Sequence, residues 1–449
     1  MLFGILNSFY FLPTKFRYIV IALLITLISV IAFANKLKLQ ALGRTVLIDD
    51  LKLLREAWNI QKFFDFHIIK WLFVILLTAF VIAFVPYFIK AKDRFGFKVR
   101  LIISLGSFIL FLFLIFFSRS ILPIYSFFPD DKKHYEVNGF ITGIIFITDY
   151  QLKKPALGYS QIIIDKIKSE SPVLHELDHK FKPNIILVQS EAFWDPLLLP
   201  NISINKDPIP NFRKLADRAI SGKLLVPVFG GGTGDTEFEA LTGISKHLLK
   251  PGLAYYQGFP PIPSLASILR EQGYIATGVH TYFSWFYNRT GIYKKLGFDR
   301  FISMEFFDLP HQPGPFISDL DIVNRILMEM KSTDQRDFIF AVTMENHGPY
   351  KEPRWASEKF VVNGPLSLEA KEQLQYYLES LSNADKALGK LVEELENYDE
   401  PTILLFYGDH LPYLGDDYQV YRETGYFQEN YSYEEYIKMY TVPFVAWDN

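Results

Sequence analysis

The sequence of 449 residues contains no cysteine, which excludes disulfide bonds, thiolate metal sites and cysteine nucleophiles. It also has no excess of basic charge. Its 46 Lys and Arg residues against 49 Asp and Glu give a formal net charge of −3, which argues against a nucleic-acid-binding protein. We find no internal repeat and no low-complexity tract. The sequence is therefore that of a globular or membrane protein with balanced charge.

Charged residues are missing from three apolar runs near the N-terminus, at residues 18–34, 71–89 and 101–117. At a rise of about 1.5 Å per residue, each run spans or nearly spans a bilayer core of about 30 Å. A cleaved signal peptide fits poorly, because the first run begins late and two more follow. We predict three transmembrane helices.

The orientation of these helices follows from a basic loop between the second and third runs, which contains Lys90, Lys92, Arg94, Lys98 and Arg100. The positive-inside rule places this loop in the cytoplasm. The residues after 118 are then expected outside the cell. The sequence predicts a multi-pass protein of the cell membrane with a large extracellular part.

Residues 1–118 form the predicted membrane domain, and residues 119–181 form an extracellular connector rich in aromatic, proline and charged residues. From residue 182 to 449, strand-like runs alternate with helix-like segments. The strand-like runs are NIILVQS, KLLVPVF, YIATGVH, DFIFAVTM and TILLFY, and a long helix is expected near 367–395. Apolar strands that alternate with helices indicate an α/β domain whose mostly parallel sheet is covered on both faces.

Polar residues that could carry chemistry follow these strands. They are Glu191, Thr233, His280, Glu345 to His347, and the pair Asp409 and His410. In such sheets, sites form at the carboxyl ends of the strands. Crowded carboxylates at one rim need partners, which favours a functional site over a purely structural one.

Thr233 follows three glycines in GGGTGDTEF and precedes a helix-like stretch. A threonine hydroxyl is a weak nucleophile that needs a base or a metal ion, and a helix N-terminus beside it would favour phosphate oxygens. Alternatively, Thr233 is an ordinary helix cap. The glycine run is neither a P-loop nor a dinucleotide-binding fingerprint.

Asp409 and His410 in YGDHLP offer a carboxylate and an imidazole side by side. This combination suits Mn²⁺ or Zn²⁺, whereas a site made only of oxygen atoms would suit Mg²⁺ or Ca²⁺. Read alone, the pair could be a turn aspartate beside an exposed histidine, and Glu191 could be a surface residue.

Taken together, these strings resemble the lipoteichoic acid synthase family, membrane-anchored phosphoglycerol transferases of the alkaline phosphatase and sulfatase superfamily. The resemblance implies a sulfatase-like domain in which Glu191, Thr233, Asp409 and His410 bind a metal ion and Thr233 is the nucleophile. The family's Trp-Asn-Arg string is similar to Tyr287-Asn288-Arg289, and its Asn-His string to Asn346-His347. Tyr287, Arg289 and His347 are thereby implied to bind substrate.

The activity implied by this resemblance is the transfer of glycerophosphate from phosphatidylglycerol, or a related phospholipid, through an intermediate on Thr233. The acceptor would be a glycerophosphate chain or a glycolipid, as in lipoteichoic acid synthesis or a similar modification of the cell envelope. One divalent metal ion is expected, with Mn²⁺ favoured over Zn²⁺ or Mg²⁺.

The sequence departs from the family pattern in two ways. Tyr287 stands where tryptophan is usual, which leaves the transferred head group open. Members usually have five membrane helices and continue past the last motif, whereas this sequence has three apolar runs and stops at TVPFVAWDN. We therefore expect a shortened chain whose catalytic domain is incomplete at its C-terminus.

Other functions remain to be weighed. Sulfate ester hydrolysis is disfavoured because the sequence has neither cysteine nor the Ser-x-Pro-x-Arg string that could form formylglycine. Phosphoethanolamine transfer and phosphodiester hydrolysis stay open. His175 to His179 match the His-Glu-x-x-His pattern of zinc proteases, although this reading explains none of the later motifs. An inactive membrane-tethered binding protein is the non-enzymatic alternative.

Overall fold

The computed structural model divides the chain into two compact units, Met1–Lys153 and Lys154–Asn449. The described residues are 2–42, 46, 66–88, 93–121, 135, 137–140, 142–143, 160–170, 182–249, 254–257, 259–307, 316–351, 360–415, 418–428 and 432–449. The motif at His175 to His179 lies outside these residues. The domain boundaries at 118 and 181 stay predictions.

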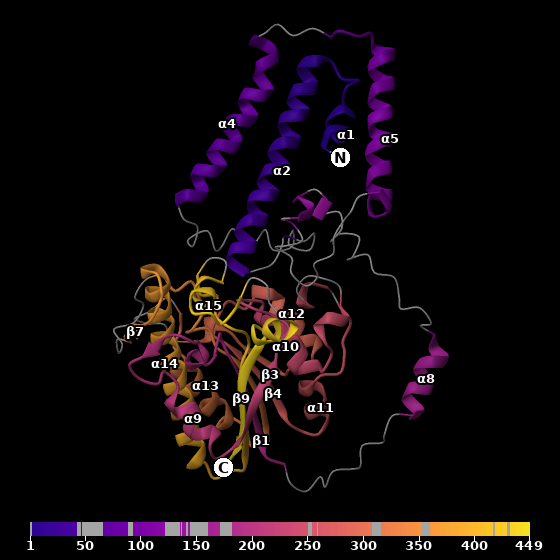
Figure 1. Ribbon diagram of the computed structural model, residues 1–449. Coiled ribbons are helices and arrows are strands. Elements are labelled where there is room, and N and C mark those ends of the chain that lie inside the picture. The colour runs from indigo at the N-terminus through magenta and orange to yellow at the C-terminus, as the bar shows by residue number, and fades with distance from the viewer. Residues whose placement is uncertain are drawn as a thin grey trace. The chain divides into compact units, whose positions relative to one another are not determined.

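The described part of the first unit consists mainly of four helices, α1 (Leu2–Asn7), α2 (Thr14–Leu42), α4 (Phe66–Phe88) and α5 (Phe97–Ile121). Within this unit, α2 packs along α4 and α1 packs along α5 (Figure 1). Across the described residues, one helix is long and apolar enough to cross a membrane, at Thr14–Lys36, and α4 contains a shorter apolar stretch at Phe73–Phe84. The first predicted span therefore coincides with an apolar helix, and the crossing of the membrane by α4 and α5 remains a prediction.

A sheet with the strand order β3-β9-β8-β1-β6-β4-β5 forms the centre of the second unit, and its edge strand β3 is exposed. Its strands are β1 (Asn184–Ser190), β3 (Ile220–Leu225), β4 (Ile275–His280), β5 (Arg300–Ile302), β6 (Asp337–Val342), β8 (Thr402–Gly408) and β9 (Thr441–Asp448). The five strands from β8 to β5 pair in parallel. Strands β2 (Ser203–Ile204) and β7 (Val362–Asn363) form a small separate antiparallel sheet. The predicted mostly parallel sheet is confirmed.

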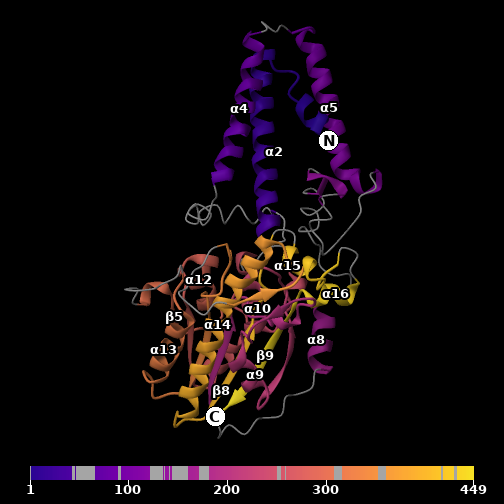
Figure 2. The same ribbon diagram turned by 60° about the vertical axis from the view of Figure 1, so that its left-hand side comes forward.

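Helices cover both faces of this sheet (Figures 1 and 2). The helices of the unit are α8 (Gln161–Glu170), α9 (Pro210–Ala216), α10 (Thr233–Thr242), α11 (Leu265–Glu271), α12 (Arg289–Lys295), α13 (Asp319–Met330), α14 (Leu368–Glu396), α15 (Gln419–Glu423) and α16 (Tyr433–Lys438). Ile186 and Val188 of β1 belong to the core shared with α9, α13 and α14, whereas Leu187 belongs to the core shared with α10, α11 and α12. Successive strand residues point to opposite faces, so an uninterrupted apolar strand requires cover on both sides.

The strand before Thr233 differs from the expectation. We expected KLLVPVF, residues 223–229, to be one of the parallel strands, but β3 ends at Leu225 and pairs antiparallel with β9, which itself pairs antiparallel with β8. Two reversals make β3 run in the same direction as β8, so its carboxyl end still points to the edge of the sheet at which the parallel strands end. The chain from 226 to 232 then leads to Thr233.

Candidate active site

Glu191 follows β1 directly and lies in a tight turn at the carboxyl edge of the sheet. Its backbone N–H donates to the Thr343 hydroxyl at 3.1 Å, and the Asn346 side-chain amide donates to the backbone oxygens of Glu191 and Ala192 at 3.1 and 3.2 Å. Ala192 has a positive φ of 49°, which turns the chain sharply away from the strand. These bonds fix the backbone of the turn from which the Glu191 side chain extends, and Glu191 is only 2% exposed.

Asp409 and His410 follow β8, the strand next to β1. The Asp409 backbone N–H donates to the Ser190 oxygen at 3.1 Å, and one carboxylate oxygen of Asp409 accepts a bond from the Ala192 N–H at 2.8 Å. Gly408 is required before them, because a Cβ there would collide with the backbone oxygen of Phe193. The two strand ends are therefore bonded to one another at the site.

The orientation of the His410 ring is set by its neighbour. Its Nδ1 lies 2.8 Å from the backbone oxygen of Leu411, and a carbonyl only accepts, so Nδ1 carries the proton. The lone pair of Nε2 then faces the carboxylates, at 3.5 Å from Glu191 Oε1 and 3.4 Å from Asp409 Oδ2. This is the tautomer that can bind a metal ion.

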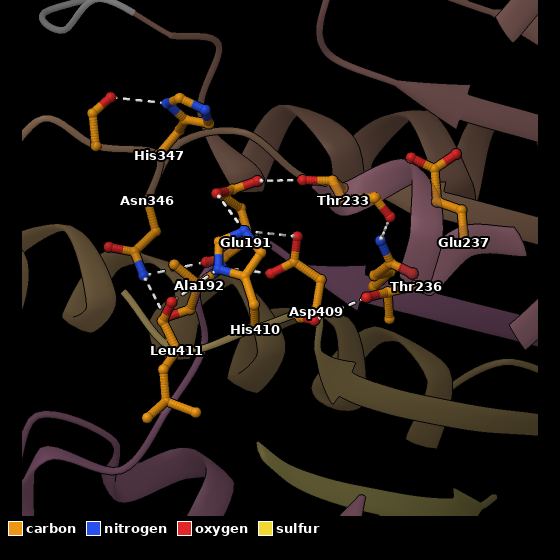
Figure 3. A network of polar contacts seen from close by, with 12 residues as sticks. Glu191, Ala192, Thr233, Thr236, Glu237, Asn346, His347, Asp409, His410 and Leu411 are labelled. Atoms are coloured by element: carbon orange, nitrogen blue, oxygen red, sulfur yellow. Dashed lines mark hydrogen bonds and ion pairs between the residues drawn. The ribbon is translucent and has the colours of Figure 1, made fainter. Parts of the chain in front are cut away.

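Thr233 is the first residue of α10, after a glycine run with positive φ values of 66°, 144° and 95° at Gly230, Gly231 and Gly232. Residues other than glycine rarely adopt such φ angles, which explains why glycine occupies all three positions. The Thr233 hydroxyl donates to Glu191 Oε2 at 3.3 Å (Figure 3). The structure thus brings the hydroxyl, two carboxylates and the imidazole together.

The polar atoms of this cluster fit a bound cation. Glu191, Asp409 and His410 each offer a ligand atom, and these atoms lie within 4.8 Å of one another. Asp409 Oδ2 and His410 Nε2 are buried, and neither has a hydrogen-bond partner among the residues that the structure describes. Burial and the Asp409 charge raise the pKa of Glu191, and burial raises the pKa of Asp409 despite the nearby His410. Two buried carboxylates of this kind call for a positive charge between them.

Of the two residues near α12 that the resemblance implies to bind substrate, Tyr287 lies against Gly234, the residue after Thr233, and Arg289 lies next to Tyr287. A Cβ on Gly234 would lie 3.0 Å from the Tyr287 ring, and the Arg289 guanidinium carbon lies 5.0 Å from the centre of that ring. Arg289 is buried and forms an ion pair with Glu237 of α10. Burial, which disfavours the charge, is outweighed by Glu237, so the pKa of Arg289 is raised.

His347 and Glu345 follow β6 and have different surroundings. His347 is exposed, and its Nδ1 lies 2.7 Å from the Gly348 backbone oxygen, apart from the carboxylates in Figure 3. Glu345 accepts bonds from the Asp319 N–H at 2.7 Å and from the Asn383 amide at 2.8 Å. Glu345 therefore ties this loop to α13 and α14 and does not join the metal-ligand cluster.

His280, at the end of β4, is buried, and its Nδ1 lies 3.0 Å from the Val342 oxygen. Burial and the Arg289 charge lower its pKa, so the ring is neutral near pH 7.

The sequence analysis missed the role of Glu237, although the TGDTEF string contains it. Its position four residues after Thr233 places both residues on one face of α10, and that spacing was the available signal.

Known proteins with related sequences or folds can now be compared. A sequence model of the Sulfatase family matches residues 183–449. A Rhizobium meliloti protein named for the modification of cyclic beta-1,2-glucan is 36% identical over 328 residues, which cover 71% of this chain and 50% of that protein. A lipoteichoic acid synthase of Staphylococcus saprophyticus is 26% identical over 245 residues, covering 51% of this chain and 36% of that enzyme.

Among solved structures, the Streptococcus pyogenes phosphoglycerol transferase GacH in complex with sn-glycerol-1-phosphate superposes with a TM-score of 0.54 at 23% sequence identity. The match covers 66% of this chain and 77% of that one. At this identity the likeness shows a shared fold. This chain spans half or less of the length of the two curated relatives.

Proposed function

Because the chain belongs to the Sulfatase family, whose sequence model matches residues 183–449, we propose that it transfers glycerophosphate from phosphatidylglycerol to an acceptor hydroxyl. The relatives named above include a transferase of the lipoteichoic acid synthase type, and the expected resemblance is confirmed at the level of the family. The head group and the acceptor are our proposal.

One observation carries this proposal. The Thr233 hydroxyl lies at the N-terminus of α10, 3.3 Å from Glu191 Oε2, beside Asp409 and His410. A hydroxyl at a helix N-terminus, next to ligands for a cation, is arranged to meet an anionic phosphate. A binding protein would have no need of this hydroxyl on the ligand cluster.

Glu191, Asp409, His410 and the Thr233 oxygen would hold the metal ion, for which we favour Mn²⁺ over Zn²⁺ or Mg²⁺. When bound, the ion polarises a phosphoryl oxygen and favours the deprotonated threonine. The Thr233 oxygen attacks phosphorus, and the bond from phosphorus to the diacylglycerol oxygen breaks. Diacylglycerol leaves as its alcohol after taking up a proton, and glycerophosphate remains on Thr233.

The second step returns Thr233 to its free form. An acceptor hydroxyl attacks the phosphorus and loses its proton, the bond from phosphorus to the threonine oxygen breaks, and that oxygen takes up a proton to restore the Thr233 hydroxyl. Arg289, Tyr287 and His347 are proposed to bind the phosphate and the glycerol hydroxyls during both steps, since Tyr287 lies beside Gly234 and Arg289 lies next to Tyr287. Arginine donors suit phosphate oxygens.

The acceptor is the point at which the relatives differ. The protein named for cyclic beta-1,2-glucan modification is 36% identical, against 26% for the lipoteichoic acid synthase. This difference supports a glucan hydroxyl as the acceptor, rather than a growing glycerophosphate chain.

We propose that the reaction occurs at the outer face of the cell membrane, to which helices α2, α4 and α5 anchor the chain.

Full-length protein with Mn²⁺ and fluorescent phosphatidylglycerol tests the proposal. We expect fluorescent diacylglycerol to be released. When the head group of phosphatidylglycerol is radiolabelled, the labelled glycerophosphate should appear on added glucan, and Thr233→Ala should abolish both. Phosphatidylethanolamine in a parallel reaction tests phosphoethanolamine transfer. Release of free glycerophosphate without acceptor labelling would indicate a phosphodiesterase. Peptide cleavage that survives Thr233→Ala would instead support a protease.

A further inference from the structure

Glu237 is a buried carboxylate of α10 that does not belong to the metal-ligand cluster. It accepts hydrogen bonds from the Tyr255 hydroxyl at 3.2 Å and the Tyr293 hydroxyl at 2.8 Å. It also accepts from Arg289 Nε, at 3.1 and 3.2 Å to its two oxygens, and from Arg289 Nη2. One carboxylate is therefore held by three side chains from two other segments.

These contacts decide which edge of the guanidinium remains available. Glu237 occupies the edge formed by Nε and Nη2. Arg289 Nη1 is buried and has no hydrogen-bond partner in the described parts of the chain. A guanidinium is planar and its five N–H groups point in fixed directions. The edge that carries Nη1 is the one left for a ligand.

Arg289 lies close to the candidate nucleophile. Its guanidinium carbon lies 5.0 Å from the centre of the Tyr287 ring, and a Cβ on Gly234, the residue after Thr233, would lie 3.0 Å from the same ring. Glu237, one turn after Thr233 on α10, satisfies one edge of Arg289 and leaves Nη1 without a hydrogen-bond partner among the described residues.

We propose that Glu237 is a positioning residue that fixes Arg289, so that its Nη1 edge is offered to the phosphate of the head group. This inference rests on the proposed function and deepens it. Tyr255 and Tyr293 fix the carboxylate in turn, since each donates its hydroxyl to Glu237 Oε2. The role in catalysis is indirect, because Glu237 acts through Arg289.

The experiment compares kcat and KM for phosphatidylglycerol in the full chain and its variants, together with equilibrium binding of glycerol 1-phosphate. Glu237→Gln keeps the shape of the side chain and removes the charge. We expect KM and the dissociation constant of glycerol 1-phosphate to rise about tenfold, as for loss of one charge-assisted contact, with a smaller fall in kcat. Glu237→Asp, which restores the charge, should recover part of the affinity.

Two matched controls separate positioning from folding. Asp385→Asn removes another buried carboxylate, which accepts from the Asn211 and Phe212 N–H groups, and Tyr274→Phe removes a hydroxyl bonded to the Pro183 oxygen. We expect both controls to leave KM within about twofold of the wild-type value, since neither touches Arg289. If Glu237→Gln fails to fold, the milder Tyr293→Phe should raise KM about threefold, as expected for one hydrogen bond.

The inference is overturned if folded Glu237→Gln binds glycerol 1-phosphate as tightly as the wild type, or if it loses only thermal stability as Asp385→Asn does. An unchanged KM in both Glu237→Gln and Tyr293→Phe overturns it as well. If the wild type does not act on phosphatidylglycerol, the proposed function fails. The positioning role is then still tested by glycerol 1-phosphate binding. The Glu237→Gln variant must bind glycerol 1-phosphate more weakly than the Asp385→Asn variant does.

Discussion

The Thr236 hydroxyl donates a hydrogen bond of 2.9 Å to the backbone oxygen of Asp409. This bond joins the first turn of α10, which begins at Thr233, to the end of β8. The nucleophile candidate and the metal-ligand candidates come from segments that are far apart in the sequence. Thr236 therefore holds their relative position.

Replacing Thr236 by Val should weaken this connection, because the isosteric side chain has no hydroxyl. We expect a loss of about 1–2 kcal/mol in stability, as for a buried acceptor left without its partner. Head-group transfer should fall about tenfold or more, since small shifts of reacting groups are costly. Thermal unfolding and initial rates measure the two effects. Thr242→Val in the same helix is the control and should retain activity, because the Thr242 hydroxyl donates to the Phe238 backbone oxygen and accepts from the Ile244 N–H, neither of which belongs to the candidate site.

A second prediction concerns Gly408. In Gly408→Ala, the added Cβ would collide with the Phe193 backbone oxygen, which cannot move without shifting the turn after β1. We expect destabilisation of about 1–3 kcal/mol, typical of overpacking, and loss of metal binding. Gly106→Ala is the control, because nothing lies within 4 Å of its added Cβ. Equal metal affinity in Gly408→Ala and the wild type would contradict this account of the glycine.

The sequence predicted the α/β class because uninterrupted apolar strands leave few alternatives. Ile186, Leu187 and Val188 must be covered on both sides, and the structure covers them with helices on both faces. The strand before Thr233 was predicted less well. Local pattern does not report the partner of a strand, and β3 reaches its place only through β9, the last strand of the chain.

The candidate site shows the same limit. Short motifs identified Glu191, Thr233, Asp409 and His410, which the structure brings together, while their catalytic roles remain predictions. The contacts of Glu237 with Tyr255, Tyr293 and Arg289 could not be predicted, because they join residues up to 56 positions apart through side chains. Spacing along a helix shows which residues share a face, but not what packs against it.

A third prediction concerns the pH dependence of stability. Burial raises the pKa of Asp385 to about 6 from 3.8, and burial also raises that of Asp337 to about 6. Between about pH 4 and 6 the folded protein retains protons that the unfolded chain has lost, so stability falls as pH rises through this window. Asp385→Asn removes one of the groups that contribute to this slope, so it should make the slope shallower. Thermal midpoints from pH 4 to 7 test this, and an unchanged slope would contradict it.

The final prediction concerns the metal ion itself. If Glu191, Asp409 and His410 hold it, removal with a chelator should lower the thermal midpoint, and added Mn²⁺ should restore it, with a gain that grows with the logarithm of its concentration above the Kd. A ligand at a hundredfold excess over its Kd stabilises the folded state by about 2.7 kcal/mol.

Asp409→Asn leaves His410 and Glu191 in place but removes one anionic ligand, so its midpoint should respond weakly to Mn²⁺. Asp385→Asn makes the same chemical change outside the cluster and should keep the full response. Because each midpoint is compared with and without the ion, the intrinsic cost of each substitution cancels. A full Mn²⁺ response in Asp409→Asn would place the ion elsewhere in the chain.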